Sequence, residues 1–504
     1  MAKHSHIHHP VQESHPRHVL APSHPSPVFL AFVRAAAPLY LRFALKFQDI
    51  RIQDPSHLLH VFQQFQNKET RLLFAFRHPY GDEPQLLQHV FDILVPRLAK
   101  KAGHPLPHRP HVRFVHGYDV AFWGGPLIRF VLPRSGAVPI QHLQADPAGM
   151  KRIRELLLHD VCPLALAPEG QISYRSGSVP RLEPGAARIG FWCAKDLEKA
   201  GRPEQALLLP VSVHYQYREK DAHKLNRFLN KLEAFCGLPK EAGSLTASAR
   251  TVDETSATSF RQAVRVRLLR LEDALLALAE AHYGVDSADS VEARRDAIIE
   301  AALTTGERML GLDKPVEKGL SGSPEEKLDA RIVRVYRIRK EGWDRIYPIR
   351  TEQGTQMRDG PRRAPEPQSP RIQADAPLPM ALRHRKAGEG WYAMRHMEVV
   401  DILEYLDAAY LDTEGNSEGP SFDRLCETAI NLQDLAWRLA GGNITTRANP
   451  LMKTALILIG EPINLSERLP AYRENRNGAV REVTNTLREE YLKLIHTYER
   501  RRNG

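Results

Sequence analysis

Short apolar runs alternate with stretches of helical period along residues 51–218. Residues 72–76 (Leu-Leu-Phe-Ala-Phe) are compatible with a strand, and the spacing from Pro84 to Leu94 is that of an amphipathic helix with proline in its first turn. The same pattern predicts strands at 112–115, 138–140, 161–167 and 207–213, and helices at 127–132, at 185–195 and from Asp146 onward. Such alternation is typical of an α/β fold.

The pattern changes after residue 218. Residues 219 to about 345 are charged and helical in period, with one apolar face formed by Phe260, Val264, Leu268, Leu271, Leu275 and Leu278. Residues 350–392 are rich in Pro, Arg and Gln, so we expect a disordered or loosely held loop there. Helical period returns at 399–410 and 423–439, and a strand at 456–459 precedes a last helix through Leu494.

The first 50 residues fall into two parts. Residues 1–27 are rich in His, Pro and Ser and are predicted to be a disordered tail. They do not form a secretory signal, because no apolar segment follows a basic start. In residues 28–50, Arg34, Arg42 and Lys46 interrupt the apolar positions, so we expect no spanning helix. Two interpretations stay open for this segment: an amphipathic helical segment in a membrane interface, or a buried packing helix.

Net charge and cysteine content say more about where the protein works than about which reaction it catalyses. The net charge is +10, from 70 Lys and Arg against 60 Asp and Glu, which suits contact with an anionic membrane surface or with nucleic acid, and also an ordinary basic surface. Four widely spaced cysteines without a Cys-x-x-Cys pair favour reduced thiols in a cytosolic protein over disulfides or a zinc site. The sequence contains no Walker loop, dinucleotide fingerprint or Gly-x-Ser-x-Gly elbow, and we expect no metal or cofactor.

Three short segments carry the candidate chemistry, and each directly follows an apolar run. They are residues 77–83 (Arg-His-Pro-Tyr-Gly-Asp-Glu), 133–140 (Pro-Arg-Ser-Gly-Ala-Val-Pro-Ile) and 167–170 (Ala-Pro-Glu-Gly). His78 precedes a proline, which favours extended geometry, so it should leave the end of its strand. Open α/β sheets place their sites at such strand ends.

In order and spacing these segments resemble the motif series of the glycerolipid acyltransferases, the lysophosphatidic-acid acyltransferase family. The resemblance covers about 70–218 and 453–495, where residues 460–463 (Gly-Glu-Pro-Ile) match the family's Gly-x-Pro-Ile after a strand. It implies a catalytic core at 51–218 with a mixed sheet flanked by helices, a large helical insertion at 219–452, and a closing strand and helix at 453–504. The alternative is a complete domain up to residue 218 with an independent helical domain after it.

The resemblance also implies roles for individual residues. His78 would be the general base, since imidazole changes charge near neutral pH. The family pattern is His, four residues, then Asp; Glu83 matches the spacing and Asp82 the residue type. We favour Glu83 as the partner of His78, with Asp82 as a helix cap. Glu169 matches a family glutamate that holds the acceptor or shapes its pocket, and Gly170 lets backbone approach the ligand.

The loop after Gly170 departs from the family. Gln171 and Ile172 stand where the family often has Thr and an Arg that binds the acceptor phosphate, while Ser173 keeps the family serine. Arg175 is close enough in sequence to substitute for the missing arginine. We therefore include Ser173 and Arg175 among the expected substrate-binding residues.

The family's second motif, Gly-x-x-x-Ile-x-Arg, is also altered. It appears as residues 136–142, from Gly136 to His142, with histidine in the arginine place. Loss of both arginines removes two bidentate phosphate donors, which weakens the case for a phosphate-bearing acceptor. Gly136, His142 and the nearby Arg134 complete the expected substrate-binding set, and Arg129 is another available cation.

By this resemblance the chain is expected to be an O-acyltransferase of phospholipid and glycerolipid biosynthesis. It would move a fatty acyl group from acyl carrier protein or coenzyme A to a hydroxyl of a lysophospholipid such as 1-acylglycerol-3-phosphate. Its partners would be the thioester donor, the lipid acceptor and the cytoplasmic face of a membrane, with no nucleic acid. The rival reading is a non-catalytic membrane- or lipid-binding protein on the same fold. A nucleic-acid-binding protein is a third, suggested by the charge and by the arginines of 350–392.

Overall fold

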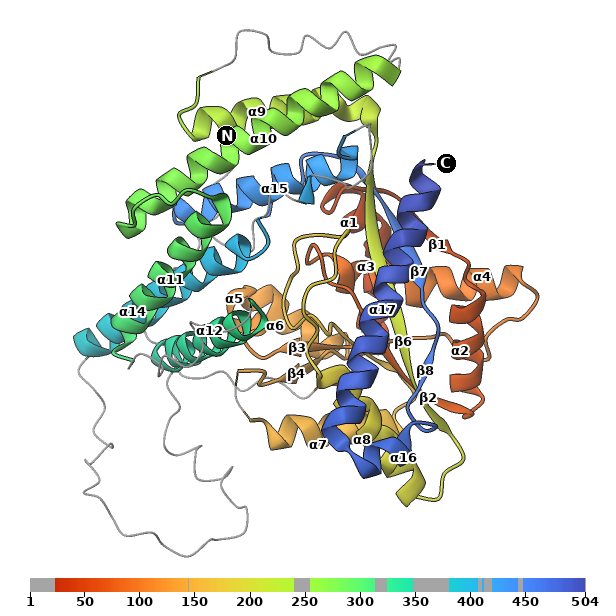
Figure 1. Ribbon diagram of the computed structural model, residues 1–504. Coiled ribbons are helices and arrows are strands. Elements are labelled where there is room, and N and C mark those ends of the chain that lie inside the picture. The colour runs from red at the N-terminus through yellow and green to blue at the C-terminus, as the bar shows by residue number, and fades with distance from the viewer. Residues whose placement is uncertain are drawn as a thin grey trace, which may run out of the picture. The chain divides into compact units, whose positions relative to one another are not determined.

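The structure is a computed structural model that describes residues 23–143, 145–239, 254–312, 324–347, 380–406, 410–411, 419–442 and 447–503. The chain divides into two units (Figure 1). One, called here the sheet unit, comprises Ala21–Ala274, Tyr405–Asp434 and Thr445–Gly504; the other, the helical unit, comprises Met1–Leu20, Leu275–Glu404 and Leu435–Ile444.

The described part of the sheet unit is built on a mixed sheet of eight strands in the order β1-β7-β6-β2-β5-β3-β4, with β8 also paired to β6. The strands are β1 (Phe47–Gln53), β2 (Thr70–Phe76), β3 (Arg113–Gly117), β4 (Val138–Ile140), β5 (Leu164–Leu166), β6 (Gln205–Tyr217), β7 (Lys453–Ile459) and β8 (Ile463–Asn464). Neighbours pair in parallel except β6 with β7 and β6 with β8, which are antiparallel. β7 and β8 therefore return the chain to this sheet after the helices of residues 219–452.

Strand register brings several chain segments to one edge of the sheet. Ala75 of β2 pairs with Leu166 of β5, so the loops that follow these two strands leave side by side. β7 runs against β6, and its first residue, Lys453, pairs with Tyr217 at the end of β6. The edge where the parallel strands end consequently also receives the start of β7.

Helices cover both faces of the sheet because β2 is apolar on both sides. Leu73 and Ala75 point into a core with α7, α8, α16 and α17, while Phe74 packs against Phe62 and Phe91 on the other face, with ring centroids 4.7–5.4 Å away. Figure 1 shows α17 running along the sheet. The helices described in the sheet unit include α1 (Pro27–Phe43), α2 (Ser56–Gln66), α3 (Glu83–His89), a π-helical turn (Val90–Leu94), α4 (Val95–Lys101), α5 (Val120–Trp123), α6 (Gly125–Arg134), α7 (Pro147–His159), α8 (Gly185–Lys199), α9 (Ala222–Phe235), α16 (Leu469–Glu474) and α17 (Arg476–Asn503).

The helical unit has α11 (Val291–Leu310), α12 (Pro324–Ile346) and α14 (Met380–Leu403); α10 (Glu254–Tyr283) and α15 (Phe422–Leu439) each contribute residues to both units. Helices α12 and α14 approach closely at Gly342 and Gly390. A Cβ at Gly390 would lie 2.6 Å from the Gly342 carbonyl oxygen, so a larger residue would force the two helices apart.

The structure confirms the α/β class, the mixed sheet flanked by helices and the presence of a helical region. The cap expected before α7 is also present, because the Asp146 carboxylate accepts a hydrogen bond from the Gly149 N–H at 2.9 Å. No helix in the described ranges is both long enough and apolar enough to cross a bilayer.

Two segment predictions were wrong in part. The expected helical segment at 28–50 ends as a helix at Phe43, and its last residues enter β1, where Ile50 pairs with Ala455 of β7. The expected loop at 350–392 is helical from Met380 onward, where α14 packs against α12 with Gly390 close to Gly342; residues 348–379 lie outside the described residues. Most of the tail predicted at 1–27 also lies outside them.

Candidate active site

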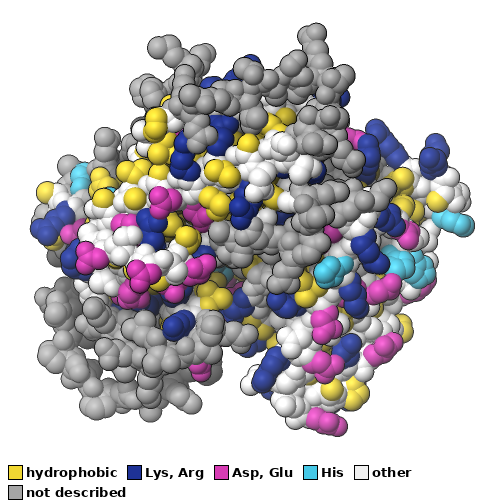
Figure 2. Space-filling model, turned by 45° about the horizontal axis from the view of Figure 1, so that its top comes forward, with side chains coloured by type: hydrophobic (Ala, Val, Ile, Leu, Met, Phe, Trp, Pro, Cys, Tyr) yellow, Lys and Arg dark blue, Asp and Glu magenta, His cyan; other side chains and the backbone are white. Residues whose placement is uncertain are grey.

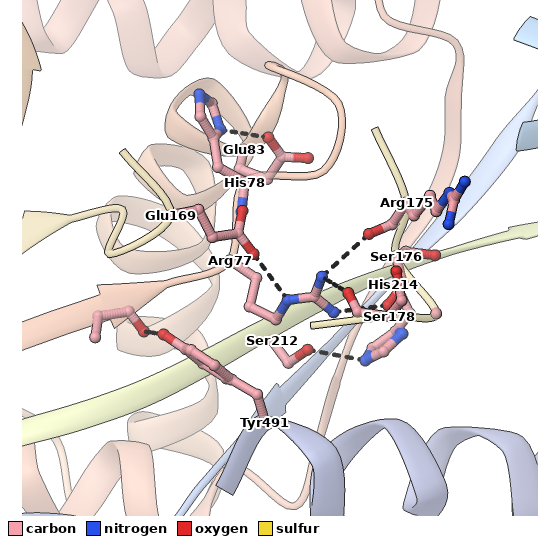
Figure 3. A network of polar contacts seen from close by, with 12 residues as sticks. Arg77, His78, Glu83, Glu169, Arg175, Ser176, Ser178, Ser212, His214 and Tyr491 are labelled. Carbon is pink, nitrogen blue, oxygen red and sulfur yellow. Dashed lines mark hydrogen bonds and ion pairs between the residues drawn. The ribbon is translucent and has the colours of Figure 1, made fainter. Parts of the chain in front are cut away.

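His78 lies in the loop directly after β2 and contacts Glu83, the first residue of α3 (Figure 3). The imidazole Nδ1 is 2.7 Å from the Glu83 Oε2. A carboxylate accepts hydrogen bonds only, so the proton of the neutral ring sits on Nδ1. Nε2 points away from Glu83 as a free base, and the His78 side chain keeps 20% exposure while that of Glu83 is fully buried.

The Glu83 carboxylate is held by three further donors. The backbone N–H groups of Tyr80 and Gly81 each donate to it at 2.9 Å, and the Tyr215 hydroxyl donates to its Oε1. Gly81 adopts a φ of 90°, a conformation that glycine allows without steric cost. Burial opposes the charged carboxylate, but hydrogen bonds from His78 and Tyr215 outweigh burial and hold the pKa of Glu83 below its ordinary value of 4.5.

The same pairing favours the protonated form of His78. Burial disfavours the imidazolium, but the hydrogen bond and charge of Glu83, together with the charges of Glu169 and Asp82, raise the pKa of His78 above 6.5. The ring therefore takes up a proton readily while its tautomer is fixed. This is the arrangement needed for an oriented general base.

Asp82 contacts a different partner. It occupies the position before α3, but its side chain makes no capping hydrogen bond there. Its Oδ2 is instead 2.6 Å from the Nζ of Lys453, a fully buried side chain at the start of β7. The Lys453 ammonium also lies 4.8–5.1 Å from the ring centroids of Phe47, Tyr80 and Tyr215. The predicted helix-cap role of Asp82 was wrong, because a buried ammonium attracts its carboxylate more strongly than backbone N–H groups do.

Glu169, in the loop after β5, is fully buried and has no open side to a ligand. Its Oε1 accepts from the Nε of Arg77 at 3.0 Å, and its Oε2 accepts from the backbone N–H of His78 at 2.8 Å. The glutamate thus joins the two loops that the sequence singled out. Through its hydrogen bond with the His78 N–H, Glu169 helps to position the His78 backbone.

Arg77 fixes the remainder of the loop after β5. Its fully buried guanidinium donates to the Ser176 carbonyl at 2.7 Å, to the Arg175 carbonyl at 3.1 Å and to the Ser178 carbonyl (Figure 3). One guanidinium therefore holds Glu169 and three backbone carbonyls within residues 175–178 near the end of β2. Arg77 stands next to His78 in the motif, yet only the fold shows where its side chain goes.

Gly170 and Ser173 lie within this clamped loop. Gly170 has a φ of 72°, a conformation that favours glycine, and its expected role of letting backbone approach a ligand stays a prediction. The Ser173 N–H donates to the His78 carbonyl at 3.0 Å, so the two loops are joined by backbone as well. The Ser173 hydroxyl is buried with no hydrogen-bond partner among the described residues.

The outer side of the loop contacts residues 405–431. Arg175 donates to the Tyr405 carbonyl, and its guanidinium lies 4.7 Å from the ring centroid of Tyr410. Glu427 accepts from the Ser176 hydroxyl at 2.6 Å. Sequence reasoning did not foresee these contacts, because the 405–431 segment carries no motif and lies more than 200 residues downstream.

The other expected substrate-binding residues lie near α6 and β4. Arg134, at the end of α6, stacks on Phe130 at 3.8 Å from the ring centroid. Gly136 has a φ of 80°, and a Cβ there would lie 3.3 Å from Pro25. The Nδ1 of His142 is 3.7 Å from Asp119 Oδ1. The contacts described for these three residues do not include His78 or its loop.

Two cysteines of the sheet unit lie in surroundings that keep their thiols unreactive. Burial raises the pKa of Cys162 and of Cys193 to about 12, so both thiols stay protonated at neutral pH. Among the described residues no group of three His, Cys, Asp or Glu side chains is arranged to hold a metal ion. The His78 and Glu83 pair combines a partly exposed base with a fully buried orienting acid.

Comparison with known proteins adds no relative to this picture: no protein-family profile matches the chain, and no curated protein matches it significantly.

Proposed function

We propose that the chain is an O-acyltransferase with a glycerolipid-acyltransferase-like core, active in phospholipid or glycerolipid biosynthesis. The observation that carries this proposal is the His78 and Glu83 pair, with Nδ1 2.7 Å from the carboxylate, joined through Glu169 to the Pro-Glu-Gly loop. These are the groups that the resemblance names. Their convergence at one sheet edge supports the proposal independently of the sequence motif.

In the proposed reaction the acceptor hydroxyl gives its proton to His78 Nε2 as its oxygen attacks the carbonyl carbon of an acyl thioester. The tetrahedral intermediate then collapses, the carbon–sulfur bond breaks, and the imidazolium returns its proton to the leaving thiolate. The products are an oxygen ester and a free thiol on acyl carrier protein or coenzyme A. Glu83 stays ionised throughout and stabilises the imidazolium, so no enzyme nucleophile is needed.

The acceptor class follows from the resemblance, with a lysophospholipid such as 1-acylglycerol-3-phosphate as the reference compound. The family's phosphate-binding arginine is replaced by Ile172. This side chain lies so close to Gly81 that a Cβ added at the glycine would be 3.1 Å from the Ile172 Cδ1. Arg175 is held by Tyr405 and Tyr410 in the structure. Assays therefore need hydroxyl acceptors both with and without a phosphate.

Helix α1 supports peripheral attachment to the cytoplasmic face of a membrane. Residues Val28, Phe32, Leu39 and Phe43 recur at helical spacing, so they share one face, and each is 65–82% exposed. On the inner side Arg34 donates to Asp92 at 3.1 Å. The helix thus buries Leu30 and Leu41 beside this ion pair and exposes a second apolar stripe, which is typical of a membrane or protein contact surface.

The apolar surface continues onto α6, which lies beside α1. The Ser26 N–H donates to the Arg134 carbonyl at 2.9 Å, and the rings of Phe29 and Phe130 are 5.9 Å apart. Leu127 of α6 is 70% exposed. On the face drawn in Figure 2, positive side chains are interspersed with negative ones among the described residues, so the docking proposal rests on this apolar surface and not on net charge.

The deciding experiment is an acyl-transfer assay with the purified full-length chain. Acyl-coenzyme A and acyl carrier protein serve as donors, with mass-spectrometric detection of the acylated lipid. His78→Ala should lower the rate by at least about 100-fold, the usual scale for loss of a general base. His60→Ala, at an exposed histidine of α2, is the matched control and should leave it unchanged.

The rival is a non-catalytic lipid-binding protein on the same core. It is favoured if no hydroxyl lipid is acylated, or if His78→Ala keeps the full rate. Binding of lysophospholipid without turnover would support that rival directly. The missing arginines at Ile172 and His142 motivate keeping it as the alternative.

A further inference from the structure

We propose that Tyr215 is a positioning residue of this site, which holds the Glu83 carboxylate against His78 and sets how strongly the imidazole binds a proton. This inference rests on the proposed function for its catalytic meaning. It assigns a third member to a unit that the sequence motif limits to a histidine and an acid. Tyr215 lies on β6, 132 residues beyond Glu83.

Tyr215 is placed for this role by its strand and its neighbours. Its hydroxyl donates to Glu83 Oε1, while His78 binds the other oxygen, Oε2. The side chain is fully buried, and its ring packs against that of Tyr80 with centroids 4.1 Å apart and the planes tilted by 33°. The Lys453 ammonium lies 5.1 Å from the Tyr215 ring centroid. Packing on both sides therefore keeps the hydroxyl aimed at Glu83.

A phenol in this position acts on the histidine through the carboxylate. The positive end of the O–H dipole points at Glu83 and offsets part of the negative charge that His78 experiences. Burial and the charge of Glu83 raise the pKa of Tyr215 well above 10, so the hydroxyl remains a donor at all working pH values. If the hydroxyl is removed, His78 faces a less compensated carboxylate and should bind its proton more tightly.

The charged and titratable groups around the pair come from several elements. Asp82 and Tyr80 lie in the loop of His78 itself, Glu169 comes from the loop after β5, and Arg77 compensates Glu169 at 3.0 Å. Lys453 from β7 compensates Asp82 at 2.6 Å. Tyr215 is the donor from β6 that reaches the Glu83 carboxylate itself. Its removal should therefore shift the titration of His78 while the flanking ion pairs stay intact.

The test uses Tyr215→Phe with Tyr217→Phe as its matched control. Tyr217 stands two positions further along the same strand, is also buried, and its hydroxyl donates a hydrogen bond to the Tyr80 hydroxyl at 3.1 Å. Both variants lose one buried hydroxyl, but only Tyr215→Phe loses a donor to Glu83. The His78 imidazole is titrated by nuclear magnetic resonance on the full chain, with His78→Ala used to assign its signal.

In Tyr215→Phe we expect the His78 titration midpoint to rise by about one pH unit, the scale of one hydrogen bond to a carboxylate. The acid limb of kcat/KM should move upward by the same amount, and Tyr217→Phe should move neither. Fluorotyrosine at position 215 keeps the shape but donates more strongly, so it should move the midpoint downward. This third protein decides the matter if Tyr215→Phe fails to fold.

Two results overturn the inference: an unchanged midpoint in folded Tyr215→Phe or in the fluorotyrosine protein, or an equal shift in Tyr217→Phe. The titration does not depend on turnover, so its outcome is separate from that of the acyl-transfer assay. A shifted midpoint in a protein without transfer activity would sink the proposed function and leave the coupling of Tyr215 to His78 standing. An active protein whose His78 midpoint does not move would support the proposed function and overturn the coupling of Tyr215 to His78.

Discussion

Replacing Arg77 by methionine should release the loop after β5 and disable the site. The guanidinium makes one ion pair, to Glu169 at 3.0 Å, and donates to three backbone carbonyls between residues 175 and 178. The contacts with Glu169, Arg175 and Ser176 are buried, so water does not readily replace them, and the contact with Ser178 is partly buried. Glu169 would keep only the N–H donor of His78, with no cation to balance its charge.

The size of the effect follows from this burial. Removing one partner of a buried ion pair costs about 3–5 kcal/mol. If that loss falls on local opening of the loop, its amides should exchange hydrogen roughly 100- to 4000-fold faster, because about 1.4 kcal/mol corresponds to a factor of ten. The His78 loop should open with it, since the Ser173 N–H donates to the His78 carbonyl at 3.0 Å.

Hydrogen exchange with mass spectrometry resolves this effect by peptide. Peptides over 76–83 and 169–178 should gain deuterium faster in Arg77→Met, while those over α17 serve as the internal reference. Arg71→Met is the matched control, because Arg71 is a buried arginine of β2 whose donors go to the carbonyls of Leu156, Leu157 and Asp160. Equal exchange of the 169–178 peptide in both variants would refute the reasoning.

Three further predictions follow. Glu83→Gln should lower the melting temperature most between about pH 4.5 and 6.5. The stability that the Glu83 charge contributes is present above pH 4.5, its ordinary pKa, and is lost as pH falls through its lowered pKa. The stability that protonated His78 contributes is full below pH 6.5 and is lost as pH rises through its raised pKa. Calorimetric scans from pH 4 to 9 that show a constant gap to the wild type would contradict this. Lys453→Met should reduce the free energy of unfolding by about 1–3 kcal/mol, less than for a fully buried pair because the Asp82 side chain is 16% exposed, and Asp82→Asn added to it should recover part of the loss in denaturant titrations. Phe32→Asp in α1 should weaken binding to vesicles that contain anionic lipid by about tenfold or more, since burial of such a side chain contributes roughly 1.5–3 kcal/mol; Val161→Asp, at an 87% exposed position before β5, should leave sedimentation with vesicles unchanged.

The sequence alone determined the local elements and the two loops that build the site. An apolar run ending at Phe76, followed by His78 and Pro79, predicted a histidine at a strand end, because short apolar runs and proline act through backbone preferences that neighbouring residues control. The cap at Asp146 was predictable for the same reason. These features need only a few consecutive residues.

The tertiary structure decided which groups act on one another. Glu83, and not Asp82, contacts His78, because Asp82 is paired with Lys453, a residue 371 positions further along the chain. Glu169 accepts hydrogen bonds from Arg77 and from the His78 N–H, and its expected role in holding the acceptor or shaping the acceptor pocket stays a prediction. Such outcomes depend on strand register and on competition between buried charges, which join segments that the linear pattern cannot pair.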